Sequence, residues 1–214
     1  MTRFLRSLAV LFLASVIASC SGKTVDESNP EELYKDAEED IQNDRYLIAR
    51  DKLRTVKNKF PYSRFSTDAE LRIGDVQFMQ ESFLEAAATY ETFRDLHPKH
   101  ERVPYALFRI GESYYGDIPD NVARDLTSAN KAIDALNEFI GQFGKHPDAE
   151  RARELLLVCR TRLAEKENYV ADFYLRRGQT EAAKRRYRKV IGSFADTDPA
   201  RHAREKLTEL GEGK

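Results

Sequence analysis

The chain has 214 residues, of which 33% are charged and 10% are aromatic, with 10 glycines and 7 prolines. This length fits one domain or a short repeat array, and the composition excludes a low-complexity chain. The formal net charge is -1, so the basic surplus typical of nucleic-acid binding is missing and we expect no nucleic-acid partner.

The amino-terminal segment has the features of a bacterial signal peptide. Arg3 and Arg6 form a positively charged start, and the apolar run over residues 7–18 is too short to span a bilayer comfortably. We therefore expect residues 1–19 to be a signal peptide that is removed during export.

The end of this segment resembles the lipobox of bacterial lipoproteins. Residues 17–20 read Ile-Ala-Ser-Cys, where the usual form is Leu, Ala or Ser, Gly or Ala, then Cys. The resemblance implies a diacylglycerol on Cys20 and an amide-linked acyl chain, and several acyl chains anchor a protein stably. Ser21 in place of Asp favours the outer membrane, so we expect a lipid anchor there, a tether over 20–29 and a periplasmic body. The alternatives are ordinary secretion with a coincidental cysteine and an inner-membrane anchor helix.

Small residues and prolines recur with a common period in the body of the chain. Positions 37 residues apart form three sets: Ala37, Gly74 and Gly111; Ala49 and Ala86; Pro61 and Pro98. The next interval is 49 residues for both the alanine and the proline sets, which continue at Ala135 and Pro147, so about twelve residues are inserted in the third unit. The segment 116–121, rich in Gly, Asp, Pro and Asn, is the expected inserted loop.

Each unit predicts two helices, a short turn, and a proline that ends the second helix. Apolar residues three or four positions apart form one stripe per helix, as in Leu33, Ala37 and Ile41. Small residues are expected where the helices cross, and stacked neighbours bury the stripes. The pattern resembles the tetratricopeptide repeat, although the usual early tryptophan is missing and the usual period is about 34. We expect amino-terminal repeats over 30–98 and carboxy-terminal repeats, with the insertion, over 99–210.

The last unit is less regular. Residues 148–177 contain no glycine or proline and predict one long helix that Gly178 ends. A helix over 181–191 and a polar helix over 200–210 follow, and the last one is typical of a solubilising cap. The predicted fold is an all-α solenoid of about four to five tetratricopeptide-like hairpins with a terminal cap helix.

Several segments go beyond a generic repeat. They are Asn29-Pro30 with Tyr34 and Ala37, Phe60-Pro61-Tyr62-Ser63, Tyr105 with Arg109 and Gly111, and the blocks 162–167, 169–174 and 177–178. With the lipobox and the inserted third unit, they resemble the BamD (ComL/YfiO-like) lipoproteins of the outer-membrane β-barrel assembly machinery. The resemblance covers nearly all of the chain after the signal peptide. It implies a scaffold that helps to fold and insert outer-membrane barrels.

The resemblance also implies a client-binding surface on the amino-terminal repeats, which would receive unfolded outer-membrane proteins. The candidate residues are aromatic or arginine side chains near the first turns: Tyr34, Tyr62, Arg64 and Phe65. Such side chains engage extended segments well. The alternative is that Tyr34 and Phe65 pack between repeats.

A second surface is implied on the carboxy-terminal repeats, which would dock on the POTRA domain of the barrel-forming BamA subunit nearest the membrane. The candidates are Arg185, Arg186 and Arg188, and the family arginine used in this docking falls near Arg186. Clustered arginines suit an acidic partner surface. The alternative is an ordinary solvated helix face.

The sequence contains no recognisable catalytic or phosphate-binding motif, so we expect neither an enzyme nor a cofactor. His97 and His146 precede the closing prolines of two units and are expected to be structural, not metal ligands. Cys159 follows Leu157 and Val158 and is expected to be buried, against the alternative of a reactive or dimer-forming thiol. The rival functions are another tetratricopeptide lipoprotein adaptor, for pilus assembly or an envelope hydrolase, and an enzyme of an unrecognised type.

Overall fold

A computed structural model describes residues 26–212. All regular secondary structure in this range is helical, which confirms the all-α prediction. The helices are, in chain order, α2 (Pro30–Gln42), α3 (Tyr46–Lys59), α4 (Arg64–Met79), α5 (Phe83–Leu96), α6 (Val103–Gly116), α7 (Thr127–Phe143), α8 (Ala149–Arg176), α9 (Thr180–Ser193) and α10 (Asp198–Glu209). None of these helices combines the length and apolar character of a membrane-spanning segment. The expected signal peptide and Cys20 lie outside the described residues.

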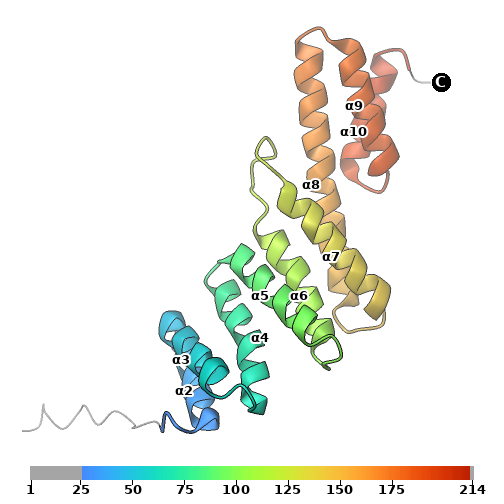
Figure 1. Cartoon of the computed structure of the whole chain (residues 1–214). Helices are drawn as coiled ribbons and strands as arrows, with labels where there is room; N and C mark the ends of the chain where they lie inside the picture. Colours follow the sequence, from blue (N-terminus) through green and yellow to red (C-terminus); the bar gives the residue numbers. More distant parts are fainter. Residues whose placement is uncertain (1–25, 213–214) are drawn as a thin grey trace, which may run out of the picture.

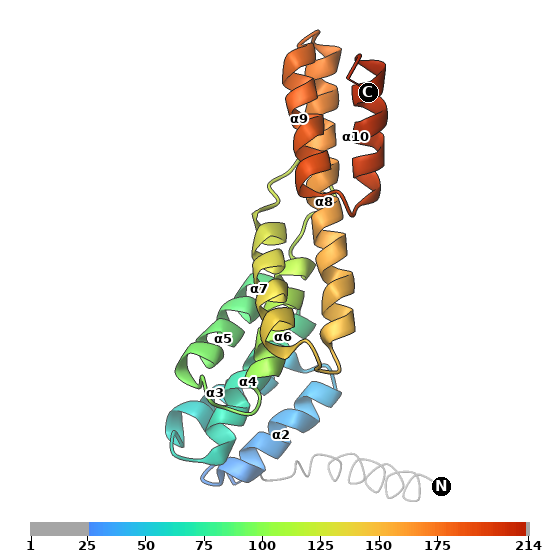
Figure 2. The same cartoon turned by 90° about the vertical axis from the view of Figure 1, so that its right-hand side faces the viewer.

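Consecutive helices pack against each other and form a solenoid. The pairs α2–α3, α4–α5 and α6–α7 follow one another, and α8 then pairs with α9 while α10 closes the end. Figures 1 and 2 show the pairs stacked into an elongated body, with α2 at one end and α10 at the other. The long helix predicted over residues 148–177 is α8, which ends just before Gly178.

Small residues lie where the helices of a pair cross, as predicted. A Cβ atom on Gly74 would lie 2.8 Å from a ring carbon of Tyr90, and one on Gly111 would lie 2.6 Å from a methyl carbon of Leu136. Ala37 is completely buried at the equivalent point of the first pair. Close packing leaves no room for a larger side chain at these crossings.

The turns after α2, α4 and α8 have the same backbone conformation and hydrogen-bond pattern. Asp44, Glu81 and Gly178 all have a positive φ, of 57°, 58° and 72°. The amide that follows each of them donates to a carbonyl five residues earlier, as Arg45 does to Asp40 at 2.8 Å. This is the Schellman motif, which satisfies the last carbonyls of a helix.

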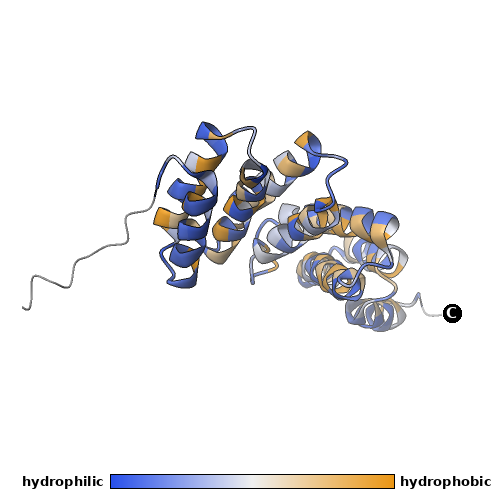
Figure 3. Ribbon diagram, turned by 90° about the horizontal axis from the view of Figure 1, so that it is seen from below, coloured by the Kyte–Doolittle hydropathy of each residue, from blue (hydrophilic) through white to orange (hydrophobic). Residues whose placement is uncertain are grey.

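The long helix α8 links two hydrophobic clusters. Its first half contributes to the central cluster with α5, α6 and α7, while Ala164 and Ala171 belong to a separate cluster with Tyr187. Its 28 residues span about 42 Å, which is long enough to reach both. Figure 3 shows apolar positions interleaved with polar ones along the helices, as expected for one buried stripe per helix.

Cys159 is the last buried residue of α8 in the central cluster. Its side chain is fully buried, which confirms the prediction for this residue. Burial raises the pKa of the Cys159 thiol to about 12, so the thiol stays protonated and unreactive near neutral pH.

Candidate functional site

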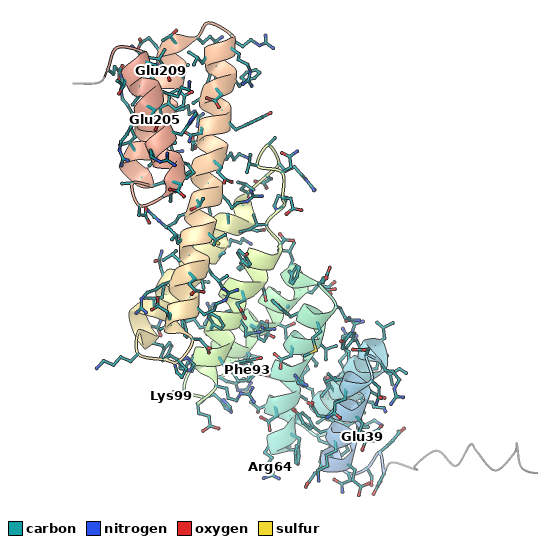
Figure 4. All side chains as sticks on the ribbon, turned by 180° about the vertical axis from the view of Figure 1, so that it is seen from behind. Glu39, Arg64, Phe93, Lys99, Glu205 and Glu209 are labelled. Atoms are coloured by element: carbon teal, nitrogen blue, oxygen red, sulfur yellow. The ribbon has the colours of Figure 1, made fainter. Side chains whose placement is uncertain are left out.

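The expected client-binding residues lie at the amino-terminal end of the solenoid, and three of the four are in contact. The rings of Tyr34 on α2 and Phe65 on α4 are 5.7 Å apart, and both pack partly buried against the first cluster. The Arg64 guanidinium lies 4.7 Å from the centre of the Phe65 ring. Figure 4 shows Arg64 at the start of α4, beside the amino-terminal helices. Tyr34 and Phe65 therefore take part in packing between repeats.

Tyr62 lies apart from that cluster. It is on the turn between α3 and α4, and its side chain is fully exposed at 101% relative accessibility. An exposed aromatic side chain combines a large apolar surface with a polar hydroxyl and is available to a partner. The four candidates thus form a packed group of three plus one free aromatic.

A polar network that sequence reasoning missed runs next to this cluster, across the first three helix pairs. We call it the inner network, and it consists of Glu38, Arg72, Asp75, Tyr90, Tyr105, Arg109 and Glu112. Its three acids are 37 residues apart, and its two arginines, Arg72 and Arg109, have the same spacing. Each acid directly follows the small residue of a helix crossing. That periodicity is the signal in the sequence by which the network could have been found.

Asp75 is the centre of the inner network. It is only 5% exposed and accepts hydrogen bonds from the hydroxyls of Tyr90 at 2.6 Å and Tyr105 at 2.5 Å. Arg72 donates to Asp75 at 3.2 Å and to both oxygens of Glu38, on the preceding pair, at 2.7 and 2.8 Å. A buried carboxylate with this many donors fixes its neighbours in place.

Arg109 extends the network to the third pair. Its guanidinium lies 3.8 Å from the centre of the Phe78 ring, donates to the Tyr90 hydroxyl at 3.2 Å, and pairs with Glu112 at 2.8 Å. Burial, reinforced by Asp75, raises the pKa of Tyr90 and of Tyr105, so both remain neutral donors at physiological pH. Positive and negative charges alternate along the network, and they hold the first three pairs in one geometry.

The three arginines predicted on α9 have different surroundings. Arg186 pairs with Glu167 of α8 at 2.8 Å, and the Nε of Arg188 donates to Glu212 at 2.8 Å. Arg185 is exposed and has no ion pair within residues 26–212. Arg185 is therefore the member of the group with its charge fully available to a partner.

The block 162–167 has a clear structural role. Arg162 donates to the carbonyl of Pro119 at 3.0 Å and also to that of Asp120, and Lys166 donates to the carbonyl of Arg124. These bonds hold the inserted loop, which spans residues 117–126, against α8. Arg162 and Lys166 thus hold the inserted loop. Glu167, the last residue of the block, instead pairs with Arg186 and Lys189 on α9.

The histidines predicted to be structural have equivalent surroundings in two repeats. The ring of His97 lies 5.0 Å from Phe93, and that of His146 lies 5.5 Å from Phe139. His97 also pairs with Glu70 at 2.8 Å. Residues 26–212 contain no group of three or more His, Cys, Asp or Glu side chains placed to hold a metal ion.

Consecutive helix pairs that stack along the chain and cross at small residues define a helical-repeat protein of the tetratricopeptide type. The chain belongs to the YfiO family of outer membrane lipoproteins, whose sequence model matches residues 26–210.

Relatives in several bacteria agree with this assignment. The chain is 26% identical to the outer membrane protein assembly factor BamD of Vibrio cholerae, over 94% of this chain and 88% of the relative. It is 29% identical to BamD of Caulobacter vibrioides, over 95% and 68%. Among solved structures, a tetratricopeptide repeat protein from Parabacteroides merdae is similar with a TM-score of 0.46 and 15% identity, over 86% of this chain and 74% of that one.

Proposed function

We propose that this chain is a lipid-anchored, non-enzymatic scaffold for the assembly of outer-membrane β-barrel proteins. The observation that carries the proposal is the family match over residues 26–210, together with relatives that are named outer membrane protein assembly factors and align over most of the chain. A rigid stack of helix pairs suits a protein that holds partners in a defined arrangement. Its anchor would be the acylated Cys20, at the outer membrane and facing the periplasm.

The amino-terminal repeats are the proposed receiver of unfolded barrel clients. Tyr62 is exposed, and the separate cluster of Tyr34, Arg64 and Phe65 adds aromatic surface and a positive charge at the same end of the solenoid. Extended segments with aromatic side chains would pack on such a surface. A photo-cross-linking side chain at position 62 should trap unfolded barrel proteins, and the same group at the exposed Arg204 on α10 should not.

The carboxy-terminal repeats are the proposed docking surface for the POTRA domain of a BamA-like barrel subunit. Arg185 offers a charge without an ion pair within residues 26–212. Arg186 and Arg188 would leave their ion pairs with Glu167 and Glu212 and pair with acids on the partner instead. The double variant Arg185→Glu/Arg188→Glu should reduce co-purification of the barrel subunit. The matched variant Arg151→Glu/Arg153→Glu on α8 should leave it unchanged.

The direct test combines a detergent pull-down of the native lipoprotein with its depletion from cells. The expected result is recovery of the barrel subunit and loss of folded outer-membrane barrels after depletion. Recovery of pilus proteins or envelope hydrolases, with barrel levels unaffected, would favour the adaptor alternative. Replacement of Cys20 by Ala should release the protein from the membrane fraction, which tests the anchor separately.

A further inference from the structure

The second helices of the first two pairs, α3 and α5, face each other across a groove of about 230 Å³. Arg54 and Lys57 line it from α3, Thr92 and Leu96 line it from α5, and Ile73 of α4 lies on its floor. These helices are on the opposite side of each pair from the first helices that supply most of the inner network. The groove thus lies away from the inner network, and its basic wall runs along α3 towards the turn that carries Tyr62.

One wall of the groove is basic. Arg50, Arg54 and Lys57 are spaced by four and three residues and share one face of α3. Arg54 has a single long ion pair of 3.8 Å to the exposed Asp51, and Lys57 has no ion pair within residues 26–212.

The only acid that lines the groove, Glu70, is already paired with His97 at 2.8 Å. The wall therefore presents positive charge that the described part of the chain does not neutralise.

On the other wall, Thr92 and Leu96 belong to an uncharged stripe that continues beyond the groove along the outside of α5. Leu84, Ala88, Thr92 and Leu96 are spaced by four residues, and the two leucines are 52% and 64% exposed. The stripe covers about 18 Å of helix. The equivalent stripe of α3 contains Asp51 and Lys59, and that of α9 contains Glu181, Arg185 and Lys189. Among these three helices, only α5 has an uncharged stripe at these positions, and the exposed Glu85 and Asp95 lie beside it.

We propose that this groove is a docking site for an amphipathic helical segment of a partner protein that carries glutamate or aspartate along one flank and leucine-like side chains along the other. The acids would face Arg54 and Lys57, and the apolar side chains would cover Leu84 and Leu96. Charge complementarity selects an acidic partner over a basic one, because a basic flank would face unneutralised cations. Helix-in-groove binding uses apolar residues at this spacing.

The test uses the full-length chain in detergent and two synthetic helical peptides of about 16 residues, close to the length of α5. Both carry the same leucine stripe, and one has glutamate where the other has lysine on the flank. Fluorescence anisotropy should show the glutamate peptide binding at least about tenfold more tightly. The double variant Arg54→Glu/Lys57→Glu should reverse that preference, and Leu96→Asp should weaken both peptides.

The matched control is Lys145→Glu/Arg204→Glu, which makes the same change in net charge at exposed sites far from the groove. This control should retain the preference for the glutamate peptide. Equal binding of the two peptides, or no effect of Arg54→Glu/Lys57→Glu, would overturn the proposal. Self-association of the chain that Arg54→Glu/Lys57→Glu abolishes would assign the groove to a second copy, and binding only to anionic vesicles would assign it to lipid.

Discussion

The Tyr90 hydroxyl donates a hydrogen bond of 2.6 Å to the Asp75 carboxylate, where α4 and α5 cross at Gly74. The same pair of residue types, 15 positions apart, recurs in the last helix pair, where Tyr187 donates to Asp172. In both pairs the aspartate directly follows the small residue of the crossing. A polar bond therefore joins the helices at the point of closest approach in two units that are far apart.

Removing this hydroxyl should destabilise the fold. We expect Tyr90→Phe to lower the free energy of unfolding by about 1–2 kcal/mol, because a buried carboxylate loses one of its donors while Tyr105 and Arg72 remain. Urea denaturation followed by circular dichroism measures the change. Tyr62→Phe removes the same atom from a fully exposed side chain and should have no measurable effect. Equal losses in the two variants would contradict a structural role for the bond.

The helix pairs could be predicted from the sequence because their markers are local. A small residue at a crossing and a proline after a helix act through their immediate neighbours, so their period of 37 residues gives the architecture directly. The charges of the inner network share this period, but the period alone does not separate buried charges from solvated ones. Charged residues at helical spacing are usually solvated, and only the packing of neighbouring pairs shows that Arg72 and Asp75 turn inward.

The same contrast between local patterns and long-range packing applies to the candidate site residues. The contact between Tyr34 and Phe65 required the stacking of two repeats, and the sequence left packing and client binding open for them. The role of the block 162–167 depends on contacts with a loop about forty residues earlier, for which no local pattern exists. Long-range side-chain contacts are therefore what the sequence did not reveal.

The turn after α4 offers a stabilising substitution. Glu81 has a φ of 58°, a conformation that costs a non-glycine residue about 1–2 kcal/mol, and the equivalent position in the last pair is Gly178. We expect Glu81→Gly to raise the free energy of unfolding by up to about 1 kcal/mol, since the greater freedom of glycine in the unfolded chain offsets part of the gain. Glu85→Gly, in the first turn of α5, should instead destabilise by up to about 1 kcal/mol, because it removes a good helix former and an acid near the helix amino terminus. Thermal denaturation should show a higher melting temperature for Glu81→Gly and a lower one for Glu85→Gly. A loss of stability in Glu81→Gly would show that the backbone at Glu81 is not strained.

The inserted loop should detach when its two cations are removed. We expect Arg162→Ala/Lys166→Ala to expose the loop at residues 117–126, because the carbonyls of Pro119 and Arg124 lose their donors. Limited trypsin digestion should then cleave after Arg124 several times faster, with unchanged helix content. Arg151→Ala/Arg153→Ala changes two arginines earlier on the same helix and should leave the rate as in the wild type. Similar rates in all three proteins would show that the loop is held by other contacts.

The pairing of Glu167 with α9 predicts a defined pH dependence. Burial alone would raise the pKa of Glu167, but hydrogen bonds from Lys189 and Arg186 outweigh it and hold the pKa below the usual 4.5. A carboxyl group with a lowered folded-state pKa contributes stability that is complete above about 4.5 and is lost as the pH falls through the lowered value. Glu167→Gln should therefore be less stable than the wild type near neutral pH, and the difference should shrink as the pH falls below about 4.5.

Chemical denaturation of wild type and Glu167→Gln at several pH values measures this difference. Glu154→Gln, which removes an exposed partner of Arg151 at 3.1 Å, is the control and should show little dependence on pH, because exposed ion pairs contribute little. A constant difference between wild type and Glu167→Gln across the whole pH range would contradict the lowered pKa. It would mean that Glu167 holds α8 and α9 together through its shape and hydrogen bonding, since the charge would then make no net contribution.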